Sequence, residues 1–193
     1  MISSFREVIS AYSTETKKLI TKISDVISEG LGLEKGYFGG ELSQVQMLSV
    51  NYYPPCPDPD VALGMHSHCD PNLFTILHQA NVYGLQIFKD GKWSAVEPLP
   101  NAFVVLIACQ LQIISNNELK SVIHRAVTNL KAARISVGTF VIPSSDCHIE
   151  PASSLSKKST KFPLYKAYQY KEFLHTYASN NGDFEAVLQF YKL

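Results

Sequence analysis

The chain has 193 residues, 46% of them hydrophobic, and a formal net charge of zero. This length and apolar content suit one sizeable core, so we expect a single domain over residues 1–193. A neutral chain lacks the positive field that attracts nucleic acid, and its longest apolar stretch, residues 102–112, is too short to cross a bilayer. We therefore expect neither nucleic acid nor a membrane as a partner.

The cysteines indicate a reducing compartment. All four stand far apart in the sequence, without the two-residue spacing of a zinc ribbon: Cys56, Cys69, Cys109 and Cys147. Such spacing also argues against a secreted disulfide scaffold. The first residues lack the basic-then-apolar order of a signal peptide. These features together predict a cytoplasmic protein.

The first predicted element is an amphipathic helix over residues 4–29, where apolar side chains recur every three or four positions. Ser4 and Glu7 have the spacing of a capping box, and Gly30 and Gly32 end the helical pattern. An apolar stripe of this kind predicts packing against a core. We assign residues 5–45 to a helical lead-in.

From residue 45 the apolar period changes from helical to strand-like. The predicted strands cover residues 45–53, 73–77, 85–88, 93–96, 103–107, 112–114, 122–127 and 135–142. Asp90 and Gly91 give a tight-hairpin signal between two of them. Short strands in succession without intervening helices fit an antiparallel double-sheet jelly roll. We therefore expect a mainly β fold with flanking helices and a jelly-roll core over residues 46–145.

Residues 146–193 are predicted to form a loop and C-terminal helices. The Ser- and Lys-rich residues 151–161 indicate a mobile loop, and helical patterns return over residues 168–178 and 183–190.

The most informative motif combines His68 and Asp70 with the distant His124. Residues two apart in a strand point to one side, so His68 and Asp70 can face one ion, which His124 reaches from another strand. Two imidazoles and a carboxylate form the facial triad of non-haem Fe(II) oxygenases. An isolated His-x-Asp pair is a weak signal for a metal and is more often a satisfied polar pair near a turn. His66 shares the alternation and could replace His68 or line the rim; we favour His68.

Arg134 and Ser136 share one face of a strongly apolar strand. A buried arginine needs an anionic partner, which is either a protein carboxylate or a ligand. A dicarboxylate that chelates the iron would accept a bidentate hydrogen bond from Arg134 and another from Ser136. Asn51 and Tyr53 could add donors from an earlier strand, although Tyr53 alone would more often be a core aromatic.

Several of these motifs together resemble the plant 2-oxoglutarate/Fe(II)-dependent dioxygenases. The resemblance rests on residues 51–60 (NYYPPCPDPD), 68–72 (HCDPN), 84–88 (GLQIF), 115–116 (SN), 124–125 (HR) and 134–136 (RIS). Within the family, four further segments resemble the hyoscyamine 6-dioxygenase type: residues 28–33, 36–38, 41–46 and 163–166.

The resemblance implies a double-stranded β-helix with iron held by His68, Asp70 and His124. It also implies that 2-oxoglutarate is held by Arg134, Ser136, Asn51 and Tyr53. The implied reaction converts 2-oxoglutarate and O2 to succinate and CO2 while hydroxylating a small plant metabolite, an alkaloid among the candidates, with ascorbate as reductant. The substrate pocket is expected to include Phe74, Phe140 and Tyr165, and the full-length protein is expected to be a monomer.

Two departures from the family pattern leave an alternative open. Ala108 and Cys109 stand where many members have Gly-Asp, so any role of that aspartate is absent. Full-length members also carry more chain before the first helix. The alternative is a truncated, catalytically impaired paralogue that binds metal, 2-oxoglutarate or a partner without turnover.

Overall fold

The computed structural model describes residues 2–158 and 162–193. Its helices are α1 (Ile2–Gly30), the 3-10 helix η1 (Gly40–Ser43), α2 (Cys109–Ile114), α3 (Ser153–Lys158), α4 (Tyr170–Ser179) and α5 (Phe184–Tyr191). Its strands are β1 (Val45–Tyr53), β2 (Leu63–His68), β3 (Phe74–His78), β4 (Leu85–Lys89), β5 (Lys92–Ala95), β6 (Val104–Ile107), β7 (His124–Val127), β8 (Arg134–Ile142), β9 (His148–Ile149) and β10 (Tyr168–Gln169).

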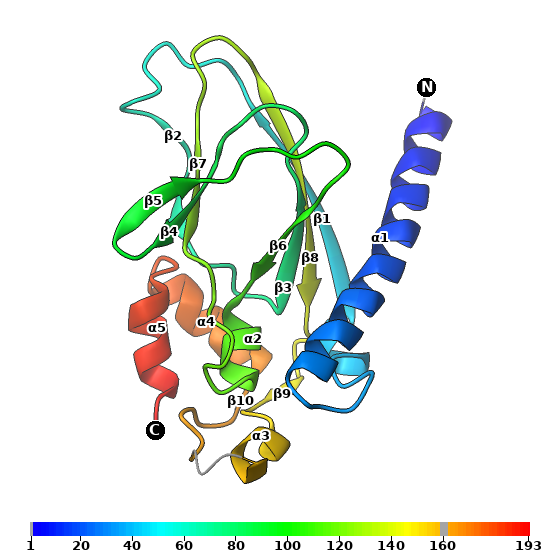
Figure 1. Cartoon of the computed structure of the whole chain (residues 1–193), viewed down its shortest axis with the longest axis vertical. Coiled ribbons are helices and arrows are strands. Elements are labelled where there is room, and N and C mark those ends of the chain that lie inside the picture. The colour runs from blue at the N-terminus through cyan, green and yellow to red at the C-terminus, as the bar shows by residue number, and fades with distance from the viewer. Residues whose placement is uncertain (1, 159–161) are drawn as a thin grey trace.

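Two four-stranded antiparallel sheets face each other in the upper part of the molecule (Figure 1). Sheet A has the strand order β1-β8-β3-β6, and sheet B has the order β2-β7-β4-β5. The non-sequential order means that the chain crosses repeatedly between the sheets, which is the connectivity of a jelly roll. The predicted mainly β jelly roll with flanking helices is therefore confirmed.

Sheet A is built on long, regular pairing. All nine residues of β1 pair with β8 without a break, which places Asn51 opposite Ser136 and Tyr53 opposite Arg134. Because side chains alternate along a strand, these four residues lie on one face of the sheet. The register thus gathers four predicted co-substrate residues at the end of one strand pair.

Sheet B is shorter and less regular. The β2–β7 pairing shifts twice along its length, but it ends with His68 directly opposite His124. The predicted hairpin between β4 and β5 is confirmed, since Asp90 and Gly91 both have positive φ angles, 51° and 76°. Such angles match the right-handed twist of the two strands.

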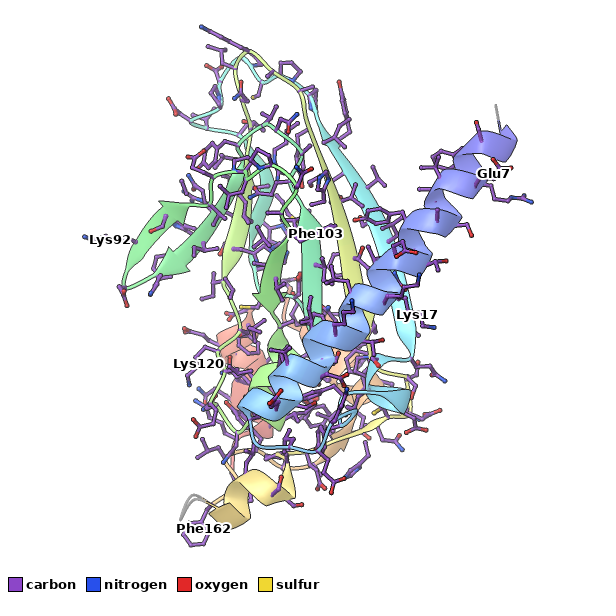
Figure 2. All side chains as sticks on the ribbon, turned by 45° about the vertical axis from the view of Figure 1, so that its right-hand side comes forward. Glu7, Lys17, Lys92, Phe103, Lys120 and Phe162 are labelled. Carbon is purple, nitrogen blue, oxygen red and sulfur yellow. The ribbon has the colours of Figure 1, made fainter. Side chains whose placement is uncertain are left out.

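Helix α1 packs across the outer side of sheet A with its C-terminal half. Ile20 of the helix and Phe74 of β3 belong to the same hydrophobic core, and the Gln46 amide donates to Thr16 Oγ1 at 2.8 Å. Figure 2 shows Glu7, near the helix start, well away from the strands. The helix ends at Gly30 as predicted, but it begins at Ile2, so Ser4 lies inside it and is not a helix cap.

The core continues below the sheets, where α2, α4 and α5 gather (Figure 1). The predicted strand over residues 112–114 is wrong, because α2 occupies Cys109–Ile114 and buries all six residues. A short apolar run bounded by turns does not by itself distinguish a buried strand from a buried helix. In the helix, the buried side-chain amides have hydrogen-bond partners. Gln110 Nε2 donates to the Pro71 carbonyl, and Gln112 Oε1 accepts from Ser121.

The C-terminal segment differs from prediction in two details. Residues 153–158 of the expected mobile loop form α3, and residues 159–161 lie outside the described residues. The helix expected from residue 168 starts at Tyr170, since Tyr168 and Gln169 pair with β9 as β10. Helix α5 follows prediction closely, and Asp183 caps it by accepting from the Ala186 N–H.

Within the described part of the chain, every helix is too short or too polar to cross a bilayer.

Candidate metal centre and carboxylate pocket

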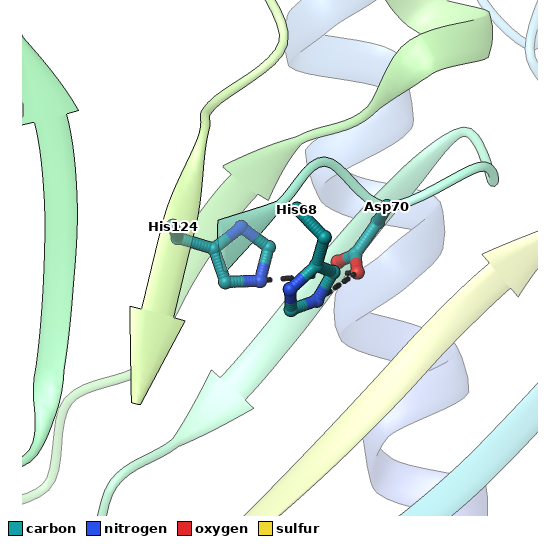
Figure 3. Close-up of side chains that lie close together, drawn as sticks. All are labelled: His68, Asp70 and His124. Atoms are coloured by element: carbon teal, nitrogen blue, oxygen red, sulfur yellow. Dashed lines mark ion pairs between the residues drawn. The ribbon is translucent and has the colours of Figure 1, made fainter. Parts of the chain in front are cut away.

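Three predicted side chains converge between the two sheets (Figure 3). His68 ends β2, Asp70 follows it in the turn, and His124 begins β7. Asp70 Oδ1 lies 3.5 Å from His68 Nε2 and 3.8 Å from His124 Nε2. The three ligand atoms lie within 4.8 Å of one another, which is close enough for them to hold one metal ion.

Backbone hydrogen bonds fix how both imidazole rings are presented. His68 Nδ1 lies 2.8 Å from the His66 carbonyl, and His124 Nδ1 lies 2.9 Å from the Val122 carbonyl. A carbonyl only accepts, so each Nδ1 carries the proton and each Nε2 keeps its lone pair for the centre of the cluster. This second hydrogen bond is the usual way in which a protein orients a metal-binding histidine.

Asp70 is held by a short chain of hydrogen bonds from sheet A. Thr75 Oγ1 of β3 donates to Asp70 Oδ2 at 2.6 Å, and Asn72 Nδ2 donates to Thr75 Oγ1 at 3.2 Å. The carboxylate thus uses one oxygen for Thr75 and turns the other toward the histidines. Asp70 lies just beyond β2, so it reaches the cluster through a turn and not through the strand alternation expected from the sequence.

Burial and charge set the protonation of the cluster. Burial raises the pKa of Asp70, but hydrogen bonds and charge from His68, His124 and Thr75 outweigh it and hold that pKa below its ordinary value. Burial lowers the pKa of both histidines. It prevails for His124, whereas for His68 the nearby Asp70 carboxylate and the His66 carbonyl outweigh burial and raise the pKa. At neutral pH Asp70 is therefore ionised and His124 neutral, which are the forms that bind a metal.

The donor set fits Fe(II). Two imidazole nitrogens and one carboxylate oxygen, each oriented by a further hydrogen bond, match the facial arrangement of non-haem iron centres. His66 is exposed, with its ring centroid 5.6 Å from that of His68, and contributes its carbonyl to the cluster. Of the two histidines left open by the sequence, the structure therefore brings His68 to Asp70 and His124.

A cavity extends from this cluster to the end of the β1–β8 pair. The four predicted co-substrate residues line it together with the metal cluster: Asn51, Tyr53, Arg134, Ser136, His68, Asp70 and His124. Leucines close its sides: Leu77, Leu85 and Leu106. Its composition, apolar with polar groups at two ends, is typical of a site for a small polar ligand.

Arg134 is the unusual charge in this cavity. The residue is 3% exposed, yet no ion pair joins it to a carboxylate of the described residues. Its hydrogen bonds are long: 3.2 Å from Nε to the Val82 carbonyl, 3.4 Å from Nη1 to Ser136 Oγ and 3.5 Å from Nη2 to Gln79 Oε1. A buried cation with only neutral, distant acceptors is electrostatically incomplete. Burial accordingly lowers its pKa, opposed by Tyr53.

The structure places one of the three residues predicted for the substrate pocket in this cavity and two outside it. Phe140 lines the cavity. Phe74 is fully buried in the core with Ile20, because it alternates with Thr75 and lies on the opposite face of β3. Tyr165 is also in the core, where its hydroxyl donates to Asn117 Oδ1 at 2.7 Å. Neither Phe74 nor Tyr165 lines the cavity.

Sequence reasoning missed three features of the site. Thr75 and Gln79 support Asp70 and Arg134, and their alternation with buried residues of β3 was the only available signal. A separate cleft of about 480 Å³ borders His68 on the side of Cys69 and is walled by residues 180–185, from the α4–α5 turn and the first two residues of α5. The turn is more than a hundred residues from His68, so no local pattern connects them.

The fold and this site define a class: a jelly roll with a candidate two-histidine, one-carboxylate metal centre beside a cationic pocket. Residues 44–143 match the family described as the 2OG-Fe(II) oxygenase superfamily. The chain belongs to this family. Its members use Fe(II), 2-oxoglutarate and O2, and these are the cofactor and co-substrates predicted from the sequence.

Known relatives agree with this assignment. The chain is 46% identical to hyoscyamine 6-dioxygenase of Hyoscyamus niger, over 98% of this chain and 55% of the relative. It is 46% identical to Protein DOWNY MILDEW RESISTANCE 6 of Arabidopsis thaliana, over 96% of this chain and 56% of the relative. The crystal structure of JOX2 in complex with 2OG, Fe and JA superposes with a TM-score of 0.81 at 41% identity, covering 87% of this chain and 51% of that chain.

The coverage of these relatives is incomplete. This chain spans about half the length of the relatives it matches.

Proposed function

We propose that this chain acts as an Fe(II)- and 2-oxoglutarate-dependent oxygenase that hydroxylates a small plant specialised metabolite. An alkaloid is the first substrate class to test, because one relative of 46% identity is a hyoscyamine dioxygenase. The single observation that carries the proposal is the buried Arg134, which has no carboxylate partner among the described residues and shares a cavity with His68, Asp70 and His124. A dicarboxylate supplies the missing charge.

In this proposal, His68, Asp70 and His124 hold the iron through Nε2, Oδ1 and Nε2. The His66 and Val122 carbonyls keep both rings in the required tautomer, and Thr75 keeps the carboxylate turned toward the ion. Bound Fe(II) supplies the redox chemistry that couples oxidation of 2-oxoglutarate by O2 to oxidation of a substrate C–H bond. The protein's part is to bind, orient and shield the reactants.

Arg134 and Ser136 bind the carboxylate of 2-oxoglutarate that lies farther from the metal. The planar guanidinium offers two parallel N–H donors to one carboxylate, and Ser136 adds a hydroxyl beside it. Asn51 and Tyr53 complete the polar end from the paired strand. Leu77, Leu85 and Leu106 exclude water around the ligand, which strengthens the charged hydrogen bonds.

The proposal is tested by anaerobic titration of the 193-residue chain with Fe(II) and 2-oxoglutarate, monitored through the weak visible charge-transfer band of the chelate. We expect a saturable band. Arg134→Ala should raise the Kd for 2-oxoglutarate roughly 10- to 150-fold, since hydrogen bonds to charged groups contribute about 1.5–3 kcal/mol. Fe(II) binding should be retained, and Arg6→Ala, an exposed arginine on α1, should change neither.

Turnover is tested separately. With O2, ascorbate and candidate alkaloids, an oxygenase forms succinate in proportion to hydroxylated product. A band without succinate under any of these conditions supports the impaired, binding-only alternative. The absence of a band from folded protein overturns the proposed function for this chain.

A further inference from the structure

Two glycines of sheet B lie directly behind the polar end of the cavity. Gly64 is the second residue of β2, and Gly84 immediately precedes β4. A Cβ added to Gly84 would lie 2.6 Å from Arg134 Cδ and 2.8 Å from Arg134 Nε. One added to Gly64 would lie 2.6 Å from Cδ1 and 2.9 Å from Cε1 of the Tyr53 ring. All four distances are far inside van der Waals contact.

The reason for glycine at these positions is space, not backbone conformation. Neither Gly64 nor Gly84 has a positive φ, so an alanine backbone is allowed at both. A methyl group has no room at either position, because side chains from sheet A pack directly against the main chain of sheet B. Arg134 and Tyr53 are paired neighbours on β8 and β1, so the two glycines face one pair of residues.

Arg134 is confined on several sides at once. The main chain of Gly84 lies behind Cδ and Nε, the Val82 carbonyl accepts from Nε, and the Tyr53 ring centroid lies 5.1 Å from the guanidinium carbon. A methyl group on Gly84 forces Cδ and Nε away from this position. The guanidinium then loses its bond to Val82 and its alignment with Ser136.

From this geometry we infer that Gly84, assisted by Gly64, is a positioning residue for 2-oxoglutarate. Because Gly84 has no side chain, the side chain of Arg134 packs directly against its main chain, and this contact fixes the guanidinium at the end of the cavity. We call this contact between Gly84 and Arg134 the seat. The inference rests on the proposed function for its ligand. The seat itself is a property of the contact between Gly84 and Arg134, so the two claims fail separately.

The experiment is a double-mutant cycle of Gly84→Ala and Arg134→Ala, measured with two readouts. The first is stability in urea. Arg134→Ala removes the two atoms nearest to the new methyl and leaves the Val127 carbonyl oxygen at 3.1 Å. The two changes should therefore be strongly non-additive, and Gly84→Ala should cost much less stability in the double variant. If Gly84→Ala alone fails to fold, recovery of folding in the double variant would show the same coupling between Gly84 and Arg134.

The second readout is binding of Fe(II), and of 2-oxoglutarate at saturating Fe(II), under anaerobic conditions. Gly84→Ala should raise the Kd for 2-oxoglutarate at least tenfold and leave the Kd for Fe(II) within twofold. In the Arg134→Ala background it should have no further effect on 2-oxoglutarate. A merely structural defect would weaken both ligands together.

Two further variants serve as controls. Gly30→Ala should change nothing, because its added Cβ meets no heavy atom of the described residues within 4 Å. Gly64→Ala should weaken 2-oxoglutarate binding and be relieved in stability by Tyr53→Ala.

The outcomes separate cleanly. Additive stability effects for Gly84 and Arg134, or an unchanged Kd for 2-oxoglutarate in a folded Gly84→Ala protein, overturn the seat. Coupled stability in a chain whose wild type binds no 2-oxoglutarate upholds the seat and overturns the proposed function.

Discussion

The two sheets contribute opposite kinds of chemistry to one cavity. Sheet B supplies His68 and His124 at the ends of short strands with an irregular register, and these residues surround the carboxylate of Asp70. Sheet A supplies Arg134 and Ser136 from its longest, unbroken strand pair, and no carboxylate in the described part of the chain balances the arginine. At the metal end, protein groups stabilise the charge of Asp70. At the other end, the charge of Arg134 is left for a bound anion to balance.

The two buried charges of the site, on Asp70 and Arg134, are stabilised to different degrees. Asp70 receives hydrogen bonds and positive charge from three protein groups, and they hold its pKa low despite burial. Within residues 2–158 and 162–193, the hydrogen-bond acceptors of Arg134 are neutral and lie at 3.2–3.5 Å, and burial lowers its pKa. Protein interiors retain such an imbalance at a cost in stability, and a bound anion removes the cost. We therefore expect added 2-oxoglutarate to stabilise the fold.

The largest expected effect is a loss of Fe(II) affinity on substitution at the metal end of the cavity. His124→Ala removes one of three predicted metal ligands, so the Kd for Fe(II) should rise at least about 100-fold, beyond the loss typical of supporting residues. Metal titration by calorimetry measures the change. His175→Ala, an exposed histidine on α4, is the matched control and should bind normally. Unchanged iron binding in His124→Ala would remove His124 from the centre.

A second variant tests the hydrogen bond by which Thr75 of sheet A supports the metal site. Thr75→Val keeps the shape of the side chain but removes the hydroxyl that donates to Asp70 at 2.6 Å. Loss of such a supporting bond costs roughly 10- to 100-fold in metal affinity. Fe(II) binding without 2-oxoglutarate should weaken accordingly. Thr128→Val, whose hydroxyl bonds to the Ala62 carbonyl, should leave the metal affinity unchanged, and equal effects from both would contradict the role of Thr75.

The smallest expected effect lies outside both sheets and should change stability but neither ligand. Tyr168 is buried, and its hydroxyl donates to Gln110 Oε1 at 2.7 Å. Tyr168→Phe leaves that oxygen unpaired, which should lower the free energy of unfolding by about 1–3 kcal/mol near neutral pH. Urea denaturation measures this, with exposed Tyr52→Phe as the control.

The same variant has a predicted pH signature. Burial raises the pKa of Tyr168 well above its ordinary value of 10.0, so the folded protein keeps this proton at pH values where the unfolded chain loses it. The unfolded state then binds fewer protons, and the stability contribution of Tyr168 falls as pH rises above 10. Tyr168→Phe should show a shallower alkaline decline, and identical slopes would contradict a buried neutral tyrosine.

The sequence alone identified most of the chemistry. The shared strand face of Arg134 and Ser136 and the hairpin at Asp90 and Gly91 follow from local patterns, so they can be read without coordinates. The family resemblance then linked distant motifs that no periodicity connects. On this basis the jelly roll and the family were predicted correctly.

The tertiary structure alone decided which residues meet. Strand pairing brought His124 opposite His68, and a turn carried Asp70 into the cluster. Burial made α2 a helix where the sequence suggested a strand, and placed Phe74 in the core on the face of β3 opposite Thr75. The need for glycine at Gly84 depends on a side chain fifty residues away. Such choices depend on long-range packing, because local propensity is weaker than the burial of a whole sheet face.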